Sequence, residues 1–271
     1  MEFTECKQLS KAVRLDCLKM VHAGKSGHIG SMLSCAEILA VLYKKILKVS
    51  PDAPKAPERD RLIFSKGHGG AALFATLAEL GYFPKEWLDT YYQDAGKLSG
   101  HISHHVPGVE FSTGSLGHGL PVACGMAMFN KNSGKNRRIF CVVSDGDLDE
   151  GSSWEAIMLA GQHKYNNLCM IVDYNRLQAL GRSEDIIDLE SLEEKLRLFN
   201  WNTVTVADGH DCSQIFEALK DFPASDKPTA VICRTVKGNG VSFMEDDYRW
   251  HYGPLTDELY VKAVAEVEAV K

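Results

Sequence analysis

The sequence predicts an α/β fold, a doubly wound parallel sheet that carries helices on both faces. Segments such as 138–144 and 168–173 are continuously apolar and rich in Val or Ile, which is typical of strands buried on both sides. Stretches with apolar residues at helical spacing lie between such segments, and strands that alternate with helices form a parallel sheet. The length of 271 residues allows one large domain, and we expect residues 1–271 to form it.

Helices are expected first along the chain. Residues 8–22 have apolar side chains at helical spacing, and the pattern stops at Gly24. Ser34 and Glu37 have the spacing of a capping box, which predicts a second helix that ends near Val49.

Strand and helix units follow a proline-rich connector. A short apolar strand leads through a Gly-rich turn into a helix, and the same order recurs further along. The expected strands cover residues 62–64, 138–144, 168–173, 201–206 and 229–235, and the expected helices cover about 71–82, 152–164, 189–198, 213–220 and 257–270. Residues 95–117, rich in Gly, His and Ser, form a long connection of the kind found at functional sites.

Composition excludes some classes of protein. The formal charge is −6 and the chain has no Lys/Arg block, so we expect no nucleic-acid partner. No apolar run approaches the roughly 18 residues of a membrane span, and the start of the chain lacks the apolar core of a secretory leader. We therefore expect a cytoplasmic protein without membrane attachment. Its eight Cys are scattered singly without metal-binding spacing, so we expect reduced core residues.

The turns after two expected strands carry oxygen-bearing side chains. Strand 138–144 is followed by Asp145 and Gly146, and the next strand ends shortly before Asn175, thirty residues after Asp145. The carboxyl ends of parallel strands meet at one edge of a sheet, where doubly wound folds bind ligands. A carboxylate, an amide oxygen and a loop carbonyl suit Mg²⁺ that keeps phosphate oxygens and water as its other ligands. Either segment alone is more simply a turn, whereas the pair favours a metal and a diphosphate.

Several separated blocks of the sequence agree with one family. Asp145-Gly146 is followed by Glu150-Gly151 and then by Asn175. The other blocks, between about residues 25 and 255, are Ser26-Gly27-His28, Leu33-Ser34, Glu37-Ile38-Leu39, Ser65-Lys66-Gly67-His68, Gly100-His101, Thr113-Gly114-Ser115-Leu116-Gly117, Thr235-Val236-Lys237-Gly238 and Trp250-His251. In this order they resemble the transketolase group of thiamine-diphosphate enzymes, whose motif runs from Gly-Asp-Gly to Asn. Agreement over several blocks is far more specific than one Gly pattern.

The resemblance implies a thiamin diphosphate-binding fold that binds thiamine diphosphate and Mg²⁺ or Ca²⁺. Asp145, Asn175 and the backbone carbonyl of Leu177 would bind the metal, and Asn175 would also contact the cofactor. Gly146 would let the backbone approach the diphosphate. The family also places three further matching positions around the cofactor, Gly114, Leu116 and Lys237.

The resemblance also implies roles for four of the ten histidines. Positions that match His28, His68, His101 and His251 line the thiazolium ring and the reacting carbon, and His68 would also donate to the diphosphate. Neutral imidazoles suit this chemistry because they donate to or accept from sugar hydroxyls and a carbonyl oxygen. A lone histidine is ordinarily a surface or satisfied core residue, which is our interpretation of His22, His163 and His210. No role is assigned to His104, His105 or His118.

Glu150 and Glu155 lie at the start of the helix after the metal turn. A solvated first turn, favoured by the helix dipole, explains them without a function. The resemblance implies instead a subunit interface and a carboxylate network that links two active sites. On that basis we expect Glu150 among the catalytic residues and Glu155 among those near the cofactor.

Three positions depart from the pattern of the family. Ser144 replaces the first Gly of Gly-Asp-Gly, and a small residue fills that position if its φ is negative. His118 stands where many relatives have Gln, and Ile29 where many have Pro. The last two bear on substrate preference, whereas the cofactor assignment does not depend on them.

The resemblance covers half of a family enzyme. Family members activate the cofactor with a Glu from a second, pyrimidine-binding domain. Here the sequence ends at Lys271, after the expected final helix. We therefore expect residues 1–271 to be a single diphosphate-binding domain whose pyrimidine-binding domain is on a partner chain, in an α2β2 assembly. A truncated sequence is the alternative.

The function implied by the resemblance is that of the N-terminal subunit of a heteromeric transketolase. With its partner, such a subunit transfers a two-carbon ketol unit from a ketose phosphate to an aldose. One alternative is a subunit of another thiamine-diphosphate enzyme that acts on a modified sugar phosphate or joins pyruvate to an aldehyde. Another is a non-catalytic module that kept the fold. A nicotinamide dehydrogenase is disfavoured because no strand is followed by G-x-G-x-x-G with an acidic residue about 20 positions further on.

Overall fold

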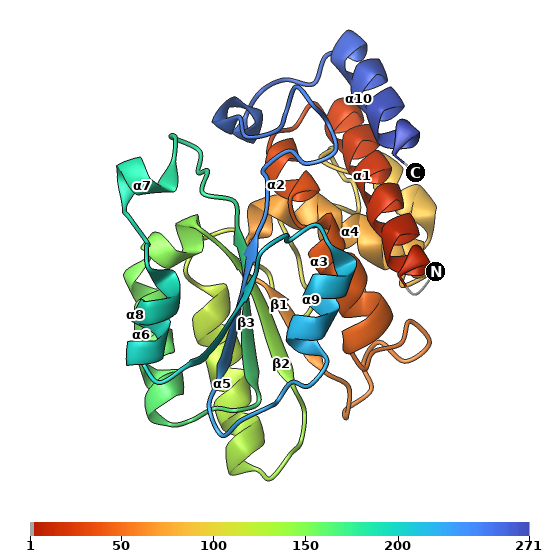
Figure 1. Ribbon diagram of the computed structural model, residues 1–271. Coiled ribbons are helices and arrows are strands. Elements are labelled where there is room, and N and C mark those ends of the chain that lie inside the picture. Colours follow the sequence, from red (N-terminus) through yellow and green to blue (C-terminus); the bar gives the residue numbers. More distant parts are fainter. Residues whose placement is uncertain (1–2, 271) are drawn as a thin grey trace.

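The fold is a parallel five-stranded sheet between two layers of helices (Figure 1). The computed structural model describes residues 3–270. All neighbouring strands are parallel, in the order β1-β2-β3-β5-β4. The strands are β1 (Arg61–Phe64), β2 (Ile139–Ser144), β3 (Leu168–Tyr174), β4 (Asn202–Val206) and β5 (Thr229–Arg234). The predicted doubly wound parallel sheet is confirmed.

Ten α-helices and five short 3₁₀ or π segments lie within the described residues. The α-helices are α1 (Thr4–Gly24), α2 (Ile29–Leu33), α3 (Ala36–Val41), α4 (Gly70–Glu79), α5 (Gly119–Asn132), α6 (Gly151–Gln162), α7 (Ser183–Ile186), α8 (Leu192–Leu198), α9 (Cys212–Leu219) and α10 (Asp257–Ala269). The short segments are η1 (Leu42–Ile46), η2 (Gly67–Gly69), η3 (Lys85–Thr90), η4 (Gly146–Asp149) and η5 (Tyr248–His251).

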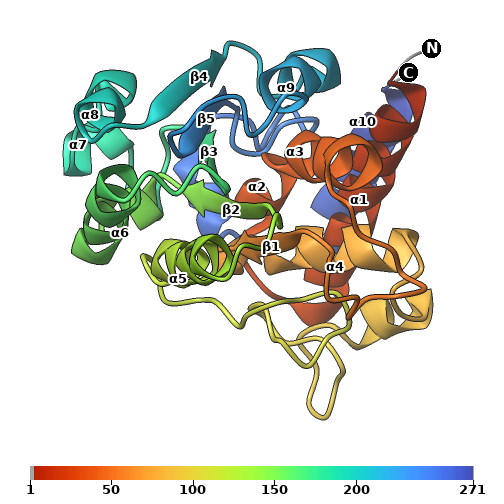
Figure 2. The ribbon, with the colours of Figure 1, turned by 90° about the horizontal axis from the view of Figure 1, so that it is seen from below.

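The sheet separates two apolar cores because side chains alternate along each strand. Phe140 and Val142 point into the core formed with α1, α3, α4 and α9. Cys141 and Val143 point into the core formed with α5, α6 and α8. Figure 2 shows the helices of the two cores on opposite sides of the sheet. Since β2 and β3 are covered on both sides, their sequences are apolar throughout rather than alternating.

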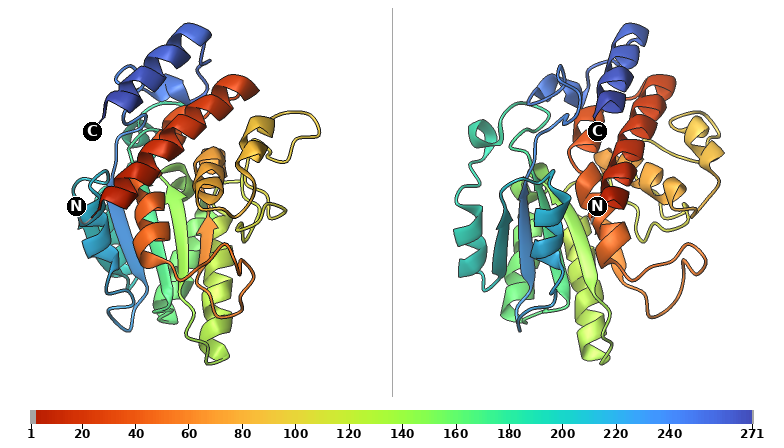
Figure 3. Two further views of the ribbon diagram at one scale, coloured as in Figure 1. Left: turned by 90° about the vertical axis from the view of Figure 1, so that its right-hand side faces the viewer. Right: turned by 45° about the vertical axis from the view of Figure 1, so that its right-hand side comes forward.

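The first and last helices are joined by packing. α1 and α10 lie side by side, so the beginning and the end of the described chain are neighbours (Figure 3). Among residues 3–270, no helix is long and apolar enough to cross a membrane. All eight cysteines are buried and unpaired, which confirms the expectation of reduced core residues.

The predicted second helix is present as α3 and the π segment η1 that continues it directly, residues 36–46, but its predicted capping box is wrong. Cys35 and not Ser34 precedes α3 in the position of the N-cap, and the short helix α2 lies before the predicted span. Ser34 makes no capping hydrogen bond, because its hydroxyl donates to Ser31 and Asp173. Glu37 pairs with Arg14 of α1 instead of completing a capping box. Tertiary partners therefore take both side chains away from the local motif.

The other expected elements agree with the structure to within a few residues, and three α-helices, the short α2 and α7 and the longer α5, were not predicted. α5 follows the long connection directly, and its sequence contains Pro121 together with Gly119 and Gly125, which weakens the helical signal. Residues 95–117 contain no α-helix or strand, as expected of a long connection.

Two glycines allow a paired test of the helix layer formed by α5 and α6. A Cβ at Gly161 of α6 would lie 1.8 Å from the carbonyl oxygen of Phe199, whereas a Cβ at Gly125 of α5 would meet no atom within 4 Å. Gly161→Ala should lower the free energy of unfolding by about 1–3 kcal/mol through overpacking. Gly125→Ala should raise it by up to about 1 kcal/mol through helix propensity. Urea unfolding of the chain checks both, and equal effects would contradict this packing.

Candidate active site

A cavity of about 260 Å³ opens where β2 and β3 end. It lies at the carboxyl edge of the sheet, where doubly wound folds bind ligands. The walls come from α2, η2, the long connection, the turn after β2, the loop after β3 and η5. Ten of the predicted site residues line it, namely His28, His68, His101, Gly114, Leu116, Asp145, Gly146, Asn175, Leu177 and His251.

Asp145 is the most unusual residue of this cavity. Its side chain is buried, and neither carboxylate oxygen has a hydrogen-bond partner within the described residues. Burial and the negative charge of Asp173 raise the pKa of Asp145 to about 8. A buried carboxylate without donors is costly, so this position fits a ligand that supplies a cation.

Asp147, two residues further on, shows that the same turn can satisfy a buried carboxylate. One of its oxygens accepts from Ser65 at 2.6 Å and from the backbone of Gly117 at 2.9 Å. The other accepts from the backbone and the hydroxyl of Ser144 at 2.9 and 3.0 Å. Asp147 therefore braces the turn, whereas Asp145 is left available. Ser144 ends β2 with a negative φ, which agrees with the expectation for a small residue in place of the first Gly.

The expected metal ligands after β3 lie in the same cavity. The side-chain oxygen of Asn175 accepts from the backbone of Leu177 at 3.1 Å, which holds the loop in a tight turn. The carbonyl oxygen of Leu177 accepts from Nζ of Lys237 at 3.2 Å. Oxygen atoms from a carboxylate, an amide and a carbonyl therefore line one cavity, and this set fits a hard divalent cation. Among the described residues, no group of three or more His, Cys, Asp or Glu forms a metal site of another kind.

Four histidine rings meet on the other side of the cavity. The ring centroid of His28 lies 4.8 Å from that of His251 and 5.6 Å from those of His68 and His101. The rings of His68 and His251 are stacked at 5.4 Å. Sequence segments more than 200 residues apart are thus brought together around one space.

The backbone of His28 is held in an uncommon conformation. Its φ is +72°, in the left-handed region, and its N–H donates to the carbonyl oxygen of His251 at 2.6 Å. Left-handed backbone in a residue other than Gly is maintained only by surrounding contacts and is frequent at functional sites. Here it joins the start of α2 to the loop that carries His251.

Three of the four imidazoles, half-buried or buried, are held in their neutral form. Burial, with the charges of His101 and Lys237, lowers the pKa of His28 to about 4. Burial, with Lys237 and His28, lowers the pKa of His251 to about 3. Burial and the nearby Lys66 bring the pKa of His68 well below its usual range. Three neutral rings are therefore ready at neutral pH to donate or accept a hydrogen bond.

Lys237 lies behind the cavity wall and is fully buried. Its Nζ lies 3.0 Å from Nδ1 of His251 and donates to the carbonyl oxygens of Leu177 and Gln178. Burial and the positive charge of Lys66 lower the pKa of Lys237 to about 8. The basic groups on one side of the cavity, three histidines and Lys237, have lowered pKa values, and the carboxyl of Asp145 on the other side has a raised one. This pattern fits an anion bound on the first side and a cation bound on the second.

Gly146 forms a narrow part of the cavity floor. A Cβ at this position would lie 3.0 Å from Cδ1 of Leu116, tighter than ordinary contact. A Cβ at Gly114 would lie 3.0 Å from the ring of His101. Both glycines therefore keep space at the cavity, as a diphosphate held by backbone requires.

Several predicted or neighbouring residues lie away from this cavity. Glu150 and Glu155 are exposed on or beside α6 and do not line it. His104 is hydrogen-bonded to Ser112 in the long connection, and its ring lies tilted at 4.2 Å from that of His105. The residues that sequence reasoning missed are Tyr252, whose ring lies 5.1 Å from that of His28, and Gln178 of the loop after β3. Both directly follow predicted site residues in sequence, which was the available signal.

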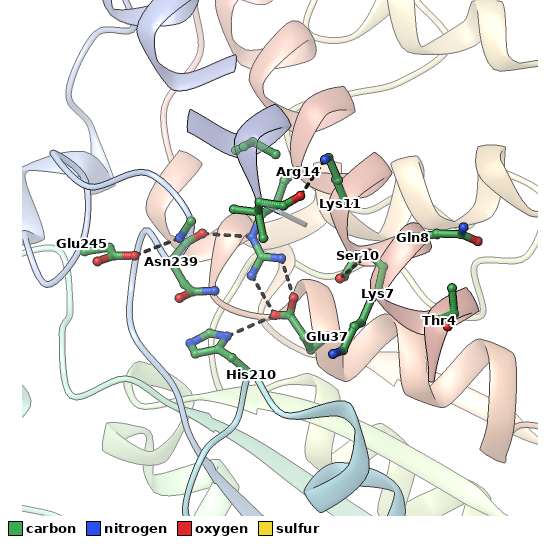
Figure 4. A pocket seen from close by; sticks show the side chains of 13 residues that line it. Thr4, Lys7, Gln8, Ser10, Lys11, Arg14, Glu37, His210, Asn239 and Glu245 are labelled. Atoms are coloured by element: carbon green, nitrogen blue, oxygen red, sulfur yellow. Dashed lines mark hydrogen bonds and ion pairs between the residues drawn. The ribbon is translucent and has the colours of Figure 1, made fainter. Parts of the chain in front are cut away.

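A larger cavity of about 810 Å³ lies elsewhere, between α1, α3 and the loop after β5 (Figure 4). Its buried polar groups satisfy one another. Arg14 binds both carboxylate oxygens of Glu37, and Nδ1 of His210 lies 3.1 Å from the same carboxylate. Nε2 of His210 accepts from the backbone of Val236 at 2.8 Å. Because Arg14, Glu37 and His210 already have partners, this trio contains no unpaired carboxylate of the kind found at Asp145.

The fold and the smaller cavity define an α/β domain with a ligand site at the carboxyl edge of its parallel sheet. Residues 6–267 match the family described as "Transketolase, thiamine diphosphate binding domain". The chain belongs to the transketolase family.

Its relatives include chains of the same length and longer ones. It is 41% identical to one subunit of the apulose-4-phosphate transketolase of Actinobacillus succinogenes, over 96% of this chain and 95% of the relative. It is 42% identical to "6-deoxy-6-sulfo-D-fructose transketolase subunit SqwG" of a Clostridium species, over 89% and 88%. The solved transketolase of Campylobacter jejuni is 32% identical with a TM-score of 0.91, and the match covers 99% of this chain and 43% of that one. The expected resemblance to the diphosphate-binding half of transketolases is confirmed.

The lowered pKa of His251 predicts an acid-sensitive contribution to stability. An unfolded histidine takes up a proton near pH 6.5, whereas folded His251 does so only near pH 3. The unfolded chain binds the extra proton between these values, so this contribution falls as pH falls from about 6.5, by up to about 1.4 kcal/mol per pH unit. His251→Asn should give a shallower loss of unfolding free energy between pH 6.5 and 4.5, measured by urea unfolding. Parallel curves for the two proteins between pH 6.5 and 4.5 would contradict this assignment.

Proposed function

We propose that this chain is the thiamine-diphosphate-binding, N-terminal subunit of a two-subunit transketolase. It would transfer a two-carbon ketol unit from a ketose phosphate to an aldose. The observation that carries the proposal is the cavity in which the unpaired carboxylate of Asp145 faces the same space as four histidine rings. The end-to-end match to relatives whose names describe one subunit of a transketolase supports the two-subunit form.

Two sets of residues would bind the metal and the diphosphate of the cofactor. Asp145, Asn175 and the carbonyl of Leu177 would hold Mg²⁺ or Ca²⁺, and Gly146 with His68 would receive the diphosphate. When bound, thiamine diphosphate supplies the electron sink for cleavage of a carbon–carbon bond. The chain itself supplies binding, orientation and electrostatics.

The histidines would act on the sugar. Lys237 donates to Nδ1 of His251, so the proton of that neutral ring lies on Nε2, and the ring can donate to a substrate oxygen. His28 and His101 flank the same space and can accept from or donate to sugar hydroxyls. The lowered pKa values of His28 and His251 keep these rings from being protonated by solvent at neutral pH.

A partner chain is supported by an exposed apolar face on α5 and α6. Phe129 is 57% exposed and Met158 is 55% exposed, and Met128 and Leu159 are exposed beside them. α5 and α6, which carry these side chains, pack against each other on the same face of the sheet (Figure 2). An apolar face of this kind ordinarily marks a protein interface. We infer that the pyrimidine-binding subunit covers it in an α2β2 assembly, with Glu150 and Glu155 at the contact.

The mouth of the cavity also lacks a cover. Leu180, at the tip of the loop after β3, is 86% exposed although it lines the cavity, and Tyr252 is exposed on the other side. The same partner would close this mouth and complete the site. Eight reduced cysteines support a cytoplasmic location.

The substrate is a sugar phosphate in this proposal. The names of two relatives, for apulose 4-phosphate and 6-deoxy-6-sulfo-D-fructose, make a modified sugar that carries an anionic group the second candidate.

Calorimetry with thiamine diphosphate and Mg²⁺ tests the proposed function. The chain mixed with a pyrimidine-binding subunit should bind the cofactor tightly and transfer ketol units from xylulose 5-phosphate, and neither component alone should turn over. Asp145→Ala should weaken the metal-dependent binding of thiamine diphosphate at least 100-fold because it removes the carboxylate ligand. Its assembly with the partner, measured by gel filtration, should persist. The exposed Asp52→Ala is the control and should bind like the unchanged chain. Absence of binding in the complete mixture would favour a non-catalytic module.

The apolar face predicts a second, independent result. Met158→Glu should weaken assembly with the partner at least tenfold, because a charge would be buried in the interface. Val261→Glu is the matched control, since Val261 is an exposed apolar residue on α10, remote from α5 and α6 (Figure 1). Analytical ultracentrifugation of the two mixtures measures this, and equal assembly by both variants would exclude the α5 and α6 face as the contact.

A further inference from the structure

Lys66 is a lysine with no exposed surface, close to the candidate site. Its Nζ forms an ion pair with Oδ2 of Asp173, which is equally buried. It also donates to the carbonyl oxygen of Ser31 at 2.9 Å and to the hydroxyl of Ser34 at 3.4 Å. All three donors of the ammonium group are therefore used.

Asp173 completes the connection on the other side of the pair. Its Oδ2 also accepts from the hydroxyl of Ser34 at 2.6 Å, and its Oδ1 accepts from the hydroxyl of Thr235 at 2.5 Å. Both carboxylate oxygens thus have partners, in contrast to those of Asp145. Four chain segments meet at this one buried ion pair: the start of η2, α2, the end of β3 and the end of β5.

Two of these segments carry histidines of the candidate site within three residues of the bonded atoms. Lys66 lies two residues before His68, and Ser31 lies three residues after His28. The ammonium group of Lys66 therefore ties together the two segments on the histidine side of the cavity.

The other two segments carry an expected metal ligand and a buried lysine. Asp173 lies two residues before Asn175, and Thr235 lies two residues before Lys237. The carboxylate of Asp173 therefore ties together the two strand ends on the metal side of the cavity, and the ion pair joins the two sides.

We propose that Lys66 is a positioning residue of the cofactor site, which fixes the histidine cluster relative to the strand ends that carry the metal ligands. The inference rests on the proposed function and adds to it a residue that does not line the cavity. Without the ammonium group, η2 loses its side-chain bonds to α2 and to β3, and only the hydrogen bond from the hydroxyl of Ser34 to Asp173 still joins the end of α2 to β3. The ring of His68 would then no longer be held at a fixed distance from Asn175, and the link from His28 to Asn175 would be weakened.

A purely structural role is the competing explanation. A buried ion pair that loses one partner leaves an uncompensated charge, which destabilises any fold wherever the pair lies. Removing both charges relieves this cost but does not restore the bond between the segments. The double variant Lys66→Met/Asp173→Asn therefore separates positioning from charge compensation.

The experiment compares Lys66→Met, the double variant and Arg138→Met. Arg138 forms a largely buried ion pair with Asp60 at 2.6 Å, at the amino ends of β1 and β2, so its loss is matched in kind but remote from the site. Three quantities are measured: the melting temperature, the affinity of the partner complex for thiamine diphosphate with Mg²⁺, and the ¹³C-histidine NMR signals of the chain alone. Substitutions of His28 and His68 assign their signals.

Positioning predicts a specific pattern. Lys66→Met should lower the melting temperature on the order of 10 °C, as Arg138→Met should within a similar range. The double variant should recover most of that loss, yet its cofactor affinity should stay at least tenfold below the unchanged protein, within the range found for residues that support metal ligands. The signals of His28 and His68 should be displaced in both Lys66 variants and unchanged in Arg138→Met.

Two results would overturn the inference. One is a double variant that binds the cofactor within twofold of the unchanged protein, and the other is a double variant with unchanged His28 and His68 signals. Failure of the unchanged complex to bind thiamine diphosphate would refute the proposed function instead. In that case the histidine signals of the chain alone still decide whether Lys66 positions the rings.

Discussion

The direction of the strands is the constraint on which the rest of this structure depends. Because all five strands are parallel, their carboxyl ends lie at one edge, and every loop that follows a strand contributes to the same region. Asp145 and Asn175 reach that region from adjacent strands, and His68 reaches it from the turn after β1. The cavity at this edge is open where Leu180 and Tyr252 are exposed. A partner that closes the edge is therefore a natural complement of this architecture.

The electrostatics of the cavity follow from the same placement. Burial beneath the loops removes water from Asp145, three histidines and Lys237, and each is pushed towards its neutral form. The fold keeps the carboxylate of Asp145 unpaired, although the same turn satisfies Asp147 completely. Asp145 on one side of the cavity and the basic groups on the other thus reduce the stability of the folded chain. This pattern is expected where a ligand brings charges of both signs.

Much of this arrangement could be predicted from the sequence, for identifiable reasons. The central strands β2, β3 and β5 were recognisable because burial on both faces makes them largely apolar. The turn that carries Asp145 and Gly146 and the four histidines were recognisable by resemblance to a family. The capping box at Ser34 and Glu37 misled because long-range partners, Asp173 and Arg14, compete for the same side chains. The role of Lys66 could not be predicted either, since its partners come from other segments. Interactions between residues more than 30 positions apart leave no local pattern.

The left-handed backbone of His28 has a consequence for the choice of replacements at that position. Alanine would remove the ring and at the same time place at φ +72° a residue that, unlike His, Asn and Asp, is not enriched in the left-handed region. Part of any defect would then come from a relaxed start of α2 rather than from the missing imidazole. Asparagine tolerates this conformation better than most residues, so it separates the chemistry of the ring from the geometry of the chain.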